Sequence, residues 1–128
     1  SLDVPTMFVE LGSSMKQWRD LKAAKAVAEA AMAAASSEKV YPAVIGIGGP
    51  HYNRKFTKIA LTSEIAFGHI IPKYAVHFID LEILRQCIKR TVEPVERIIL
   101  DWKGIKGSDK RELMDILAKV SHLPVEKV

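Results

Sequence analysis

The chain has 128 residues, of which 48% are hydrophobic, and its 19 Lys and Arg residues exceed its 15 Asp and Glu residues, giving a formal charge of +4. This length and apolar content predict a globular domain with its own core and exclude a disordered chain. The modest positive charge favours polyanionic partners without identifying them. The single cysteine, Cys87, excludes an intramolecular disulfide and a cysteine-based zinc cluster, so a reducing, cytoplasmic setting is expected.

The sequence contains no candidate membrane span, because charged residues interrupt the longest helix-like segment, roughly residues 15–36. The chain begins at Ser1, without an initiator Met and without a signal-peptide pattern. We therefore expect a soluble protein that has been processed or that is a portion of a longer one.

The amino-terminal part predicts a strand, a turn and a helix. Residues 6–11 indicate a strand that ends at Gly12. Ser14 and Gln17 then have the spacing of a capping box at a helix start. The helix continues to about Ser36, and its many alanines predict a face that packs closely on a sheet.

The middle of the chain predicts alternating strands and helices. Residues 40–47 form a nearly continuous apolar run, which is typical of an interior parallel strand covered on both faces. Residues 58–63 are too mixed to assign, whereas residues 65–71 predict a further strand. Asp80 is expected to cap a helix that ends near residue 89, and residues 95–100 predict the next strand.

The carboxy-terminal part completes the pattern. Ser108 is expected to cap a helix whose apolar residues recur with helical spacing between residues 113 and 120, and residues 125–128 predict a short edge strand. The alternation favours an α/β fold in which helices flank a mostly parallel sheet, within a single domain over residues 1–128. Sites in such folds lie at the carboxyl ends of the strands.

Residues 46–57, with the sequence GIGGPHYNRKFT, are the segment richest in chemical groups. Glycines at a strand end let a ligand approach the backbone, and His51, Tyr52 and Lys55 supply acid-base, hydrogen-bonding and anion-binding groups beside it. The simpler interpretation is a Gly-Gly-Pro turn whose polar side chains are solvated.

Polar clusters follow three of the predicted strands, at Glu10–Ser14, Gly48–Tyr52 and Asp101–Gly104. In a parallel sheet these clusters would meet at one edge, which makes a shared pocket more favourable than three unrelated turns. Each cluster alone also fits an ordinary strand end or turn. A fourth segment, residues 68–74, adds three polar side chains: His69, Lys73 and Tyr74.

The two histidines near these strand ends are candidates for chemistry, and His51 is the stronger one. His69 lies in an apolar run, where a core histidine with a hydrogen-bond partner and an acid-base or ligand role are equally open. The two could bind zinc together with nearby carboxylates, although their spacing matches no compact ligand signature. Nucleophile-elbow, Walker and dinucleotide-binding motifs do not occur, so nucleotide-cofactor chemistry is disfavoured.

The cations and aromatic residues around the glycine loop favour an anionic substrate. Lysines can hold phosphates, and aromatic rings can stack on a base or a sugar. The alternative is a solvated basic rim around a small-molecule site. The residues alone therefore indicate a hydrolytic or group-transfer site, with the following binding candidates: Tyr52, Lys55, Lys73, Tyr74, Asp101, Trp102 and Lys103.

Four motifs taken together resemble the D-aminoacyl-tRNA deacylase family of archaea and plants. They occur in the family's order across nearly the whole chain. The motifs are VELGSS at residues 9–14 with Trp18, GIGGPHY at residues 46–52 with Lys55 and Thr57, AFGHIIPKYA at residues 66–75, and DWKG at residues 101–104.

The resemblance implies an α/β fold similar to peptidyl-tRNA hydrolases and nucleoside phosphorylases. It implies hydrolysis of the ester that joins a D-amino acid to tRNA, with zinc as cofactor and with tRNA charged with D-amino acids as partner. No DNA or membrane partner is expected, and the protein is expected to be a monomer. Family members are roughly twice as long and carry a His-His-Gly-Pro segment upstream, so this chain would be the carboxy-terminal portion of a deacylase.

The resemblance also suggests roles for individual residues. His51 and His69 would position or activate a water molecule, directly or through zinc, and Glu10 or Asp101 would orient an imidazole. The backbone N–H groups of Gly48 and Gly49 would stabilise the oxyanion.

In the same hypothesis, Lys55, Lys73 and Lys103 would hold phosphates of the acceptor stem. Two alternatives remain open at this point. One is a non-catalytic RNA-binding module, and the other is a different esterase or a peptidyl-tRNA hydrolase.

Overall fold

The computed structural model describes residues 6–120 and 122–128. The chain divides into two compact units, Ser1–Lys39 and Val40–Val128, and the sheet lies entirely in the second unit. The prediction of one α/β domain over residues 1–128 stays a prediction. The expected processed start at Ser1 lies outside the described residues. No helix in the described ranges is long and apolar enough to span a membrane.

The first unit contains two helices, α1 (Met15–Trp18) and α2 (Leu21–Ala35). The prediction of one helix to Ser36 is wrong, because the Asp20 carboxylate accepts hydrogen bonds from the N–H groups of Lys22 and Ala23 and starts a second helix. Ser14 caps α1 as predicted.

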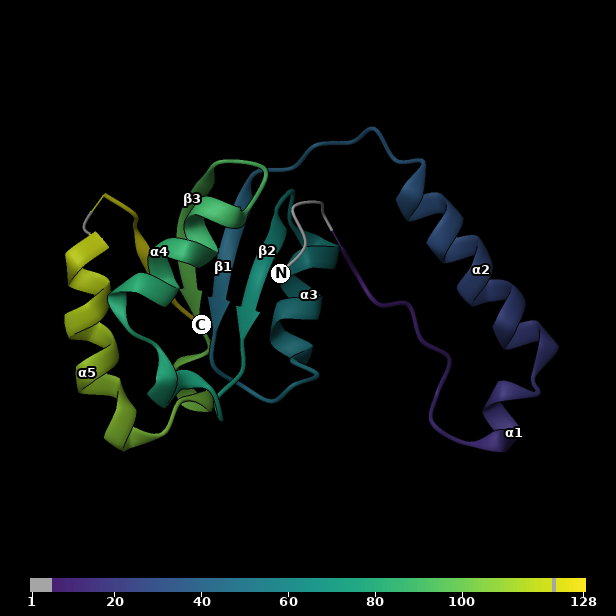
Figure 1. The fold of residues 1–128 in the computed structure, drawn as a ribbon, viewed down its shortest axis with the longest axis horizontal. Helices are drawn as coiled ribbons and strands as arrows, with labels where there is room; N and C mark the ends of the chain where they lie inside the picture. Colours follow the sequence, from purple (N-terminus) through teal and green to yellow (C-terminus); the bar gives the residue numbers. More distant parts are fainter. Residues whose placement is uncertain (1–5, 121) are drawn as a thin grey trace. The chain divides into compact units, whose positions relative to one another are not determined.

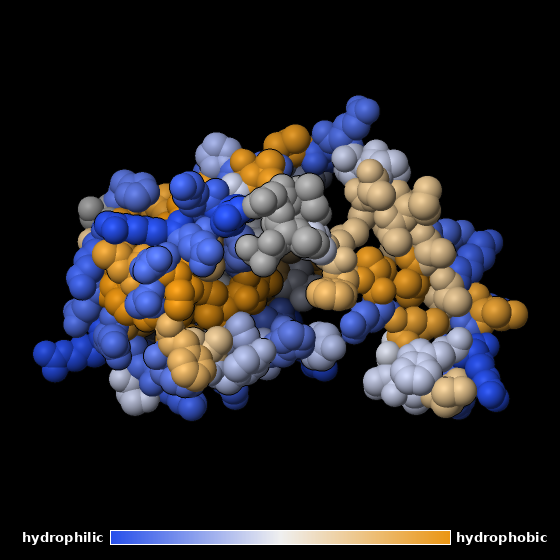
Figure 2. Space-filling model, in the orientation of Figure 1, coloured by the Kyte–Doolittle hydropathy of each residue, from blue (hydrophilic) through white to orange (hydrophobic). Residues whose placement is uncertain are grey.

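The strand predicted at residues 6–11 is also wrong, since these residues have no regular secondary structure. A strand requires a hydrogen-bonded neighbouring strand. The apolar side chains of this segment are not buried against one, and Phe8 is 90% exposed. Neither α1 nor α2 has a buried residue, and the apolar side chains of Leu21 and Met32 are exposed. Figure 2 shows hydrophobic residues on the surface of the molecule. The prediction that the alanine face packs on a sheet stays a prediction.

The second unit is built on four strands, and every pairing between them is parallel (Figure 1). The spatial order is β2-β1-β3-β4. This confirms the predicted α/β fold with a parallel sheet. The strands are β1 (Ala43–Ile47), β2 (Ala66–Ile71), β3 (Val95–Leu100) and β4 (Val125–Lys127).

Helices pack on both faces of this sheet. Because successive side chains of a strand point to opposite faces, Val44 and Ile45 of β1 belong to two separate clusters. Val44 packs with Phe56 of α3 (Arg54–Thr62), and Ile45 belongs to the larger cluster that includes buried residues of α4 (Leu81–Arg90) and α5 (Gly107–Leu117). Three short 3-10 helices complete the unit: η1 (Val76–Phe78), η2 (Trp102–Gly104) and η3 (Ala118–Val120).

The predicted element boundaries hold best where the local chemistry is unambiguous. The strand at 95–100 and the Asp80 cap, whose carboxylate accepts from the Ile83 N–H at 2.7 Å, are confirmed. β1 starts only at Ala43, after the proline at residue 42, whose ring nitrogen has no hydrogen to donate to a ladder. The predicted Ser108 cap is wrong: α5 begins one residue earlier, and the Ser108 hydroxyl donates to Asp109 instead.

Candidate functional site

The candidate site is built where β1 and β3 end side by side. Ile47 is paired with Leu100, so the loop that follows β1 and the loop that follows β3 leave the sheet at the same edge. Two of the three polar clusters predicted to converge therefore do so, at Gly48–Tyr52 and Asp101–Gly104. The third, which contains Glu10, belongs to the first unit and follows no strand.

Glycines at this edge allow the two loops to touch. Gly49 has a φ of +74°, and a Cβ added to it would lie 2.0 Å from the Asn53 amide nitrogen and 2.7 Å from an oxygen of Asp101. A Cβ on Gly104 would lie 2.7 Å from the Gly49 Cα. Gly49 and Gly104 are therefore required because the two loops touch at these residues, and not because a ligand needs space there.

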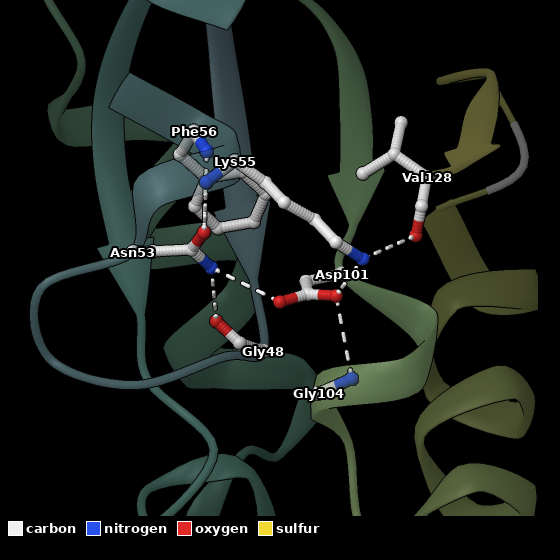
Figure 3. A network of polar contacts seen from close by, with 7 residues as sticks. All are labelled: Gly48, Asn53, Lys55, Phe56, Asp101, Gly104 and Val128. Atoms are coloured by element: carbon white, nitrogen blue, oxygen red, sulfur yellow. Dashed lines mark hydrogen bonds and ion pairs between the residues drawn. The ribbon is translucent and has the colours of Figure 1, made fainter. Parts of the chain in front are cut away.

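Asn53 holds the glycine loop and starts α3 at the same time (Figure 3). Its side-chain nitrogen donates to the Gly48 carbonyl at 3.1 Å and to Asp101 at 3.4 Å. Its side-chain oxygen accepts from the N–H groups of Lys55 and Phe56 at the helix start. Because both ends of the amide are used, this buried side chain fixes the loop relative to the helix.

Asp101 is the centre of the same network. Its carboxylate accepts from the Lys55 ammonium at 2.5 Å, from the Gly104 N–H at 3.3 Å and from Asn53. Lys55 also donates to the Val128 carbonyl at 3.3 Å, which links the end of β4 to the junction. The Asp101 side chain is 7% exposed and that of Lys55 is 44% exposed, so the pair lies at the border of the core.

This network changes the interpretation of two predicted binding residues. Asp101 is buried and accepts from three protein donors, which is the environment of a structural carboxylate. The Lys55 charge already has a carboxylate partner, so a phosphate would have to compete with Asp101 for it. The remaining predicted cations at this edge, Lys73 and Lys103, are exposed.

The N–H groups predicted to form an oxyanion hole are already in use. Gly48 donates to the Ile71 carbonyl at 2.8 Å, and Gly49 donates to the Gly104 carbonyl at 3.0 Å. These bonds join the ends of β2, β1 and β3, and they leave neither N–H group free to bind an oxyanion in this geometry. The physical reason is that a junction of three strand ends must satisfy its own backbone donors first.

His51 lies on the exposed side of this junction. Its Nδ1 is 3.4 Å from the Tyr74 hydroxyl, and its ring meets the Tyr52 ring edge-on with centroids 4.9 Å apart. The loop that carries Tyr74 is held in place because the Lys73 N–H donates to the Gly49 carbonyl at 2.8 Å. An exposed imidazole with a phenol on one ring nitrogen has its other nitrogen available for a ligand.

His69 has a different environment. It lies within β2, opposite Ile45 of β1, and its Nδ1 is 3.0 Å from the Thr91 hydroxyl, which in turn donates to the Cys87 carbonyl. This arrangement favours the structural interpretation of His69, one of the two that the sequence left open. A catalytic role for His69 stays a prediction.

Cys87 packs half-buried against the larger core cluster, as its position on an apolar helix face predicts. Burial raises the pKa of the Cys87 thiol, and a hydrogen bond to its own backbone opposes that shift. The thiol is therefore a packing group and is not activated as a nucleophile or a metal ligand.

A zinc ion does not fit the described part of the chain. Zinc in proteins takes three or four Cys, His, Asp or Glu ligands, and residues 6–120 and 122–128 contain no group of three such side chains placed to hold a metal. The two predicted ligands, His51 and His69, have separate partners, Tyr74 and Thr91. We therefore derive no chemistry through zinc.

Trp102 is one of the predicted binding residues, and two lysine side chains lie against its ring. The ammonium groups of Lys110 and Lys127 lie 4.5 and 4.0 Å from the ring centroid. The backbone N–H of Trp102 donates to the Val128 carbonyl at 3.3 Å. Lys110 and Lys127 were not among the predicted site residues, because they come from α5 and β4, and only the tertiary structure brings them to this ring.

Asn53 is the other residue that the sequence analysis missed. Its signal was present, since an asparagine followed at i+3 and i+6 by Phe56 and Ile59 is a good helix cap before an apolar helix face. Residues 58–62 of the unassigned segment are the second half of α3, and Ser63 is its C-cap. The Asn53 cap and the apolar spacing after it were sufficient to predict this helix.

Comparisons with known proteins agree with these motifs. A family model described as D-aminoacyl-tRNA deacylase matches residues 1–124. Relatives named D-aminoacyl-tRNA deacylase include those of Pyrococcus furiosus, 41% identical over 91% of this chain, and Thermococcus kodakarensis, 44% identical over 86% of it. The chain spans 43% and 41% of these two relatives. The crystal structure of a conserved protein of unknown function, AF0625, is 34% identical with a TM-score of 0.76, covering 91% of this chain and 40% of that one.

Proposed function

The chain belongs to the D-aminoacyl-tRNA deacylase family, and from this membership we propose that it serves the hydrolysis of the ester bond in D-aminoacyl-tRNA, releasing a free D-amino acid and tRNA. The observation that carries the proposal is the exposed His51 imidazole, fixed beside Tyr74 on a glycine junction at the carboxyl edge of a parallel sheet. An ester hydrolase needs a base for water in an accessible position, and His51 provides one.

His51 acts as the general base in this proposal. With its Nδ1–H donating to the Tyr74 oxygen, the Nε2 lone pair remains available and accepts a proton from water. The water oxygen then attacks the ester carbonyl carbon, the bond to the ribose oxygen breaks, and the proton is returned to that oxygen. The products are the amino acid and the free terminal hydroxyl of tRNA.

The rigid network around Asp101 positions this base without touching the substrate. Asn53 and Asp101 fix the loop from Gly48 onward, so the backbone that carries His51 has a defined course. Lys73, Lys103 and Tyr52 are exposed around it and are suited to the phosphates and the terminal base of tRNA. Asp101 and Asn53 are therefore positioning residues.

Zinc as a cofactor remains a prediction that rests on the family resemblance. A cytoplasmic location remains a prediction that rests on the single cysteine. The relatives are more than twice as long as the matched region.

The test is release of D-tyrosine from D-tyrosyl-tRNA by this chain and by the Pyrococcus furiosus relative, with L-tyrosyl-tRNA as the matched substrate. His51→Ala is expected to lower the rate constant about 100-fold or more, the usual range for loss of a general base. Tyr74→Phe is expected to lower it less, and His69→Asn is the control that leaves the base in place. Unchanged turnover in His51→Ala would show that another group is the base.

A second function, a non-catalytic RNA-binding module, is favoured by one observation: the donors and carboxylate at the junction are all engaged with each other. In that case the chain would bind tRNA and release no amino acid, whereas the Pyrococcus furiosus relative would hydrolyse the same D-tyrosyl-tRNA. Equal turnover of the D- and L-esters would instead indicate a general esterase.

A further inference from the structure

We propose that Trp102, Lys110 and Lys127 form a preassembled phosphate-binding platform that holds the RNA backbone beside the His51 site. The inference rests on the proposed function in that tRNA is the substrate. It adds two lysines, from α5 and β4, that no sequence motif joins to the site. The ligand chemistry is a phosphodiester of single-stranded RNA.

The geometry of the platform is the first argument. Lys110 and Lys127 place their ammonium groups 4.5 and 4.0 Å from the centroid of the same indole ring. Cation–π attraction and a half-buried aromatic surface hold the two long side chains in fixed positions. A prearranged pair of cations loses less conformational entropy on binding an anion than two freely moving lysines would.

The charge balance of the platform is the second argument. The ion pairs identified among the described residues join Lys25 to Glu29, Lys55 to Asp101 and Arg97 to Glu126. Neither platform lysine takes part in one of these pairs. Two positive charges that lie near one ring and outside these ion pairs attract an anion, and a phosphate would supply that partner.

The position of the platform is the third argument. Trp102 follows Asp101 directly, and the Lys55 ammonium that binds Asp101 also binds the carbonyl of Val128, the residue after Lys127. The platform is therefore continuous with the junction that carries His51, across the neighbouring ends of β1, β3 and β4. Exposed Lys103 lies next to Trp102 and extends the same basic surface.

The test measures the salt dependence of binding of deacylated tRNA and of a 12-nucleotide polyuridine to this chain. The variant is Lys110→Gln/Lys127→Gln, which keeps most of each stem and removes two charges. The matched control is Lys89→Gln/Lys119→Gln, which removes the same charge from the last turn of α4 and from η3, the segments that precede β3 and β4. Those lysines lie at the opposite edge of the sheet.

Losing two phosphate contacts is expected to lower the slope of log K against log salt by about 1.4, at about 0.7 per contact for single strands, and to weaken binding about 10- to 30-fold near 0.1 M salt. The control pair should change the slope by less than half as much. Equal effects of the two pairs would overturn the platform while leaving the hydrolytic proposal intact.

Two further results separate the two proposals. Absence of tRNA binding by the unaltered chain would overturn the platform, and the hydrolysis assay with D-tyrosyl-tRNA would still judge the catalytic role of His51. Circular dichroism of both double variants serves as the folding control. Trp102→Leu provides a second test, because it removes the ring without changing charge and is expected to weaken binding while keeping the slope.

Discussion

Replacing Gly49 by alanine should strongly destabilise the second unit. The residue has a φ of +74°, a conformation that costs an L-residue about 1–2 kcal/mol. The new Cβ would lie 2.0 Å from the Asn53 amide nitrogen, so that side chain must move and lose its bonds to Gly48 and Asp101. Leaving such buried groups unpaired costs about 1–3 kcal/mol.

These terms predict that the free energy of unfolding falls by about 3 kcal/mol, a large part of the 5–15 kcal/mol that is usual for a domain. For a domain of this size the midpoint of thermal unfolding should fall by about 12–24 °C. The measurement is urea and thermal unfolding followed by circular dichroism. A fall of less than about 1 kcal/mol would refute the argument that contact between the loops requires this glycine.

Gly107→Ala is the matched control for this experiment. A Cβ at Gly107 meets nothing within 4 Å, and the residue opens α5. Because alanine is the better helix former, the change should leave stability unchanged or raise it by up to about 1 kcal/mol. An equal loss in both variants would show that chain flexibility, and not the junction, explains the effect.

Two further predictions concern buried groups. Lys55→Met should lower the free energy of unfolding by about 1–2 kcal/mol. This is less than the roughly 3–5 kcal/mol of a fully buried pair, because the Lys55 side chain is 44% exposed. Urea unfolding measures the change, and an unchanged free energy of unfolding would mean that the Asp101 carboxylate does not need the ammonium. Burial raises the pKa of the Cys87 thiol, so its contribution to stability is complete below the ordinary thiol pKa of 9.0 and is lost as pH rises through the raised pKa. Unfolding midpoints between pH 7 and 10 should therefore fall less steeply in Cys87→Ala, and identical slopes would contradict this.

Local sequence was sufficient to predict the parallel sheet and most of its strands. Residues 95–100 contain four β-branched or aliphatic residues and are bounded by Pro94 and Asp101, and β3 has these same limits. The strand predicted at residues 6–11 failed because a short apolar segment alone does not supply a pairing partner. The helix start at Asp80 was predicted correctly because that segment contains a single capping side chain. The start of α2 was missed because Asp20, a second capping residue, lies inside what reads as one continuous helical pattern.

The candidate site divides in the same way. Three polar clusters were predicted to meet at one edge of the sheet, and the two that follow β1 and β3 do. Their glycines were expected to leave room and free N–H groups for a ligand, whereas Gly48 and Gly49 use those groups to join strand ends. The sequence favoured His51 and left the role of His69 open, and the structure places the two on different elements with different partners.

The sequence by itself determined the family, the α/β fold and the strand ends at which the polar residues gather, because these depend on motifs and on apolar periodicity within short segments. Only the tertiary structure decided which polar groups are free. The Asp101 carboxylate and the Lys55 ammonium, 46 residues apart in the sequence, bind each other. Lys110 and Lys127, from two other elements, both contact the Trp102 ring. Electrostatic interactions act through space, and their partners are set by the packing of the sheet and its helices.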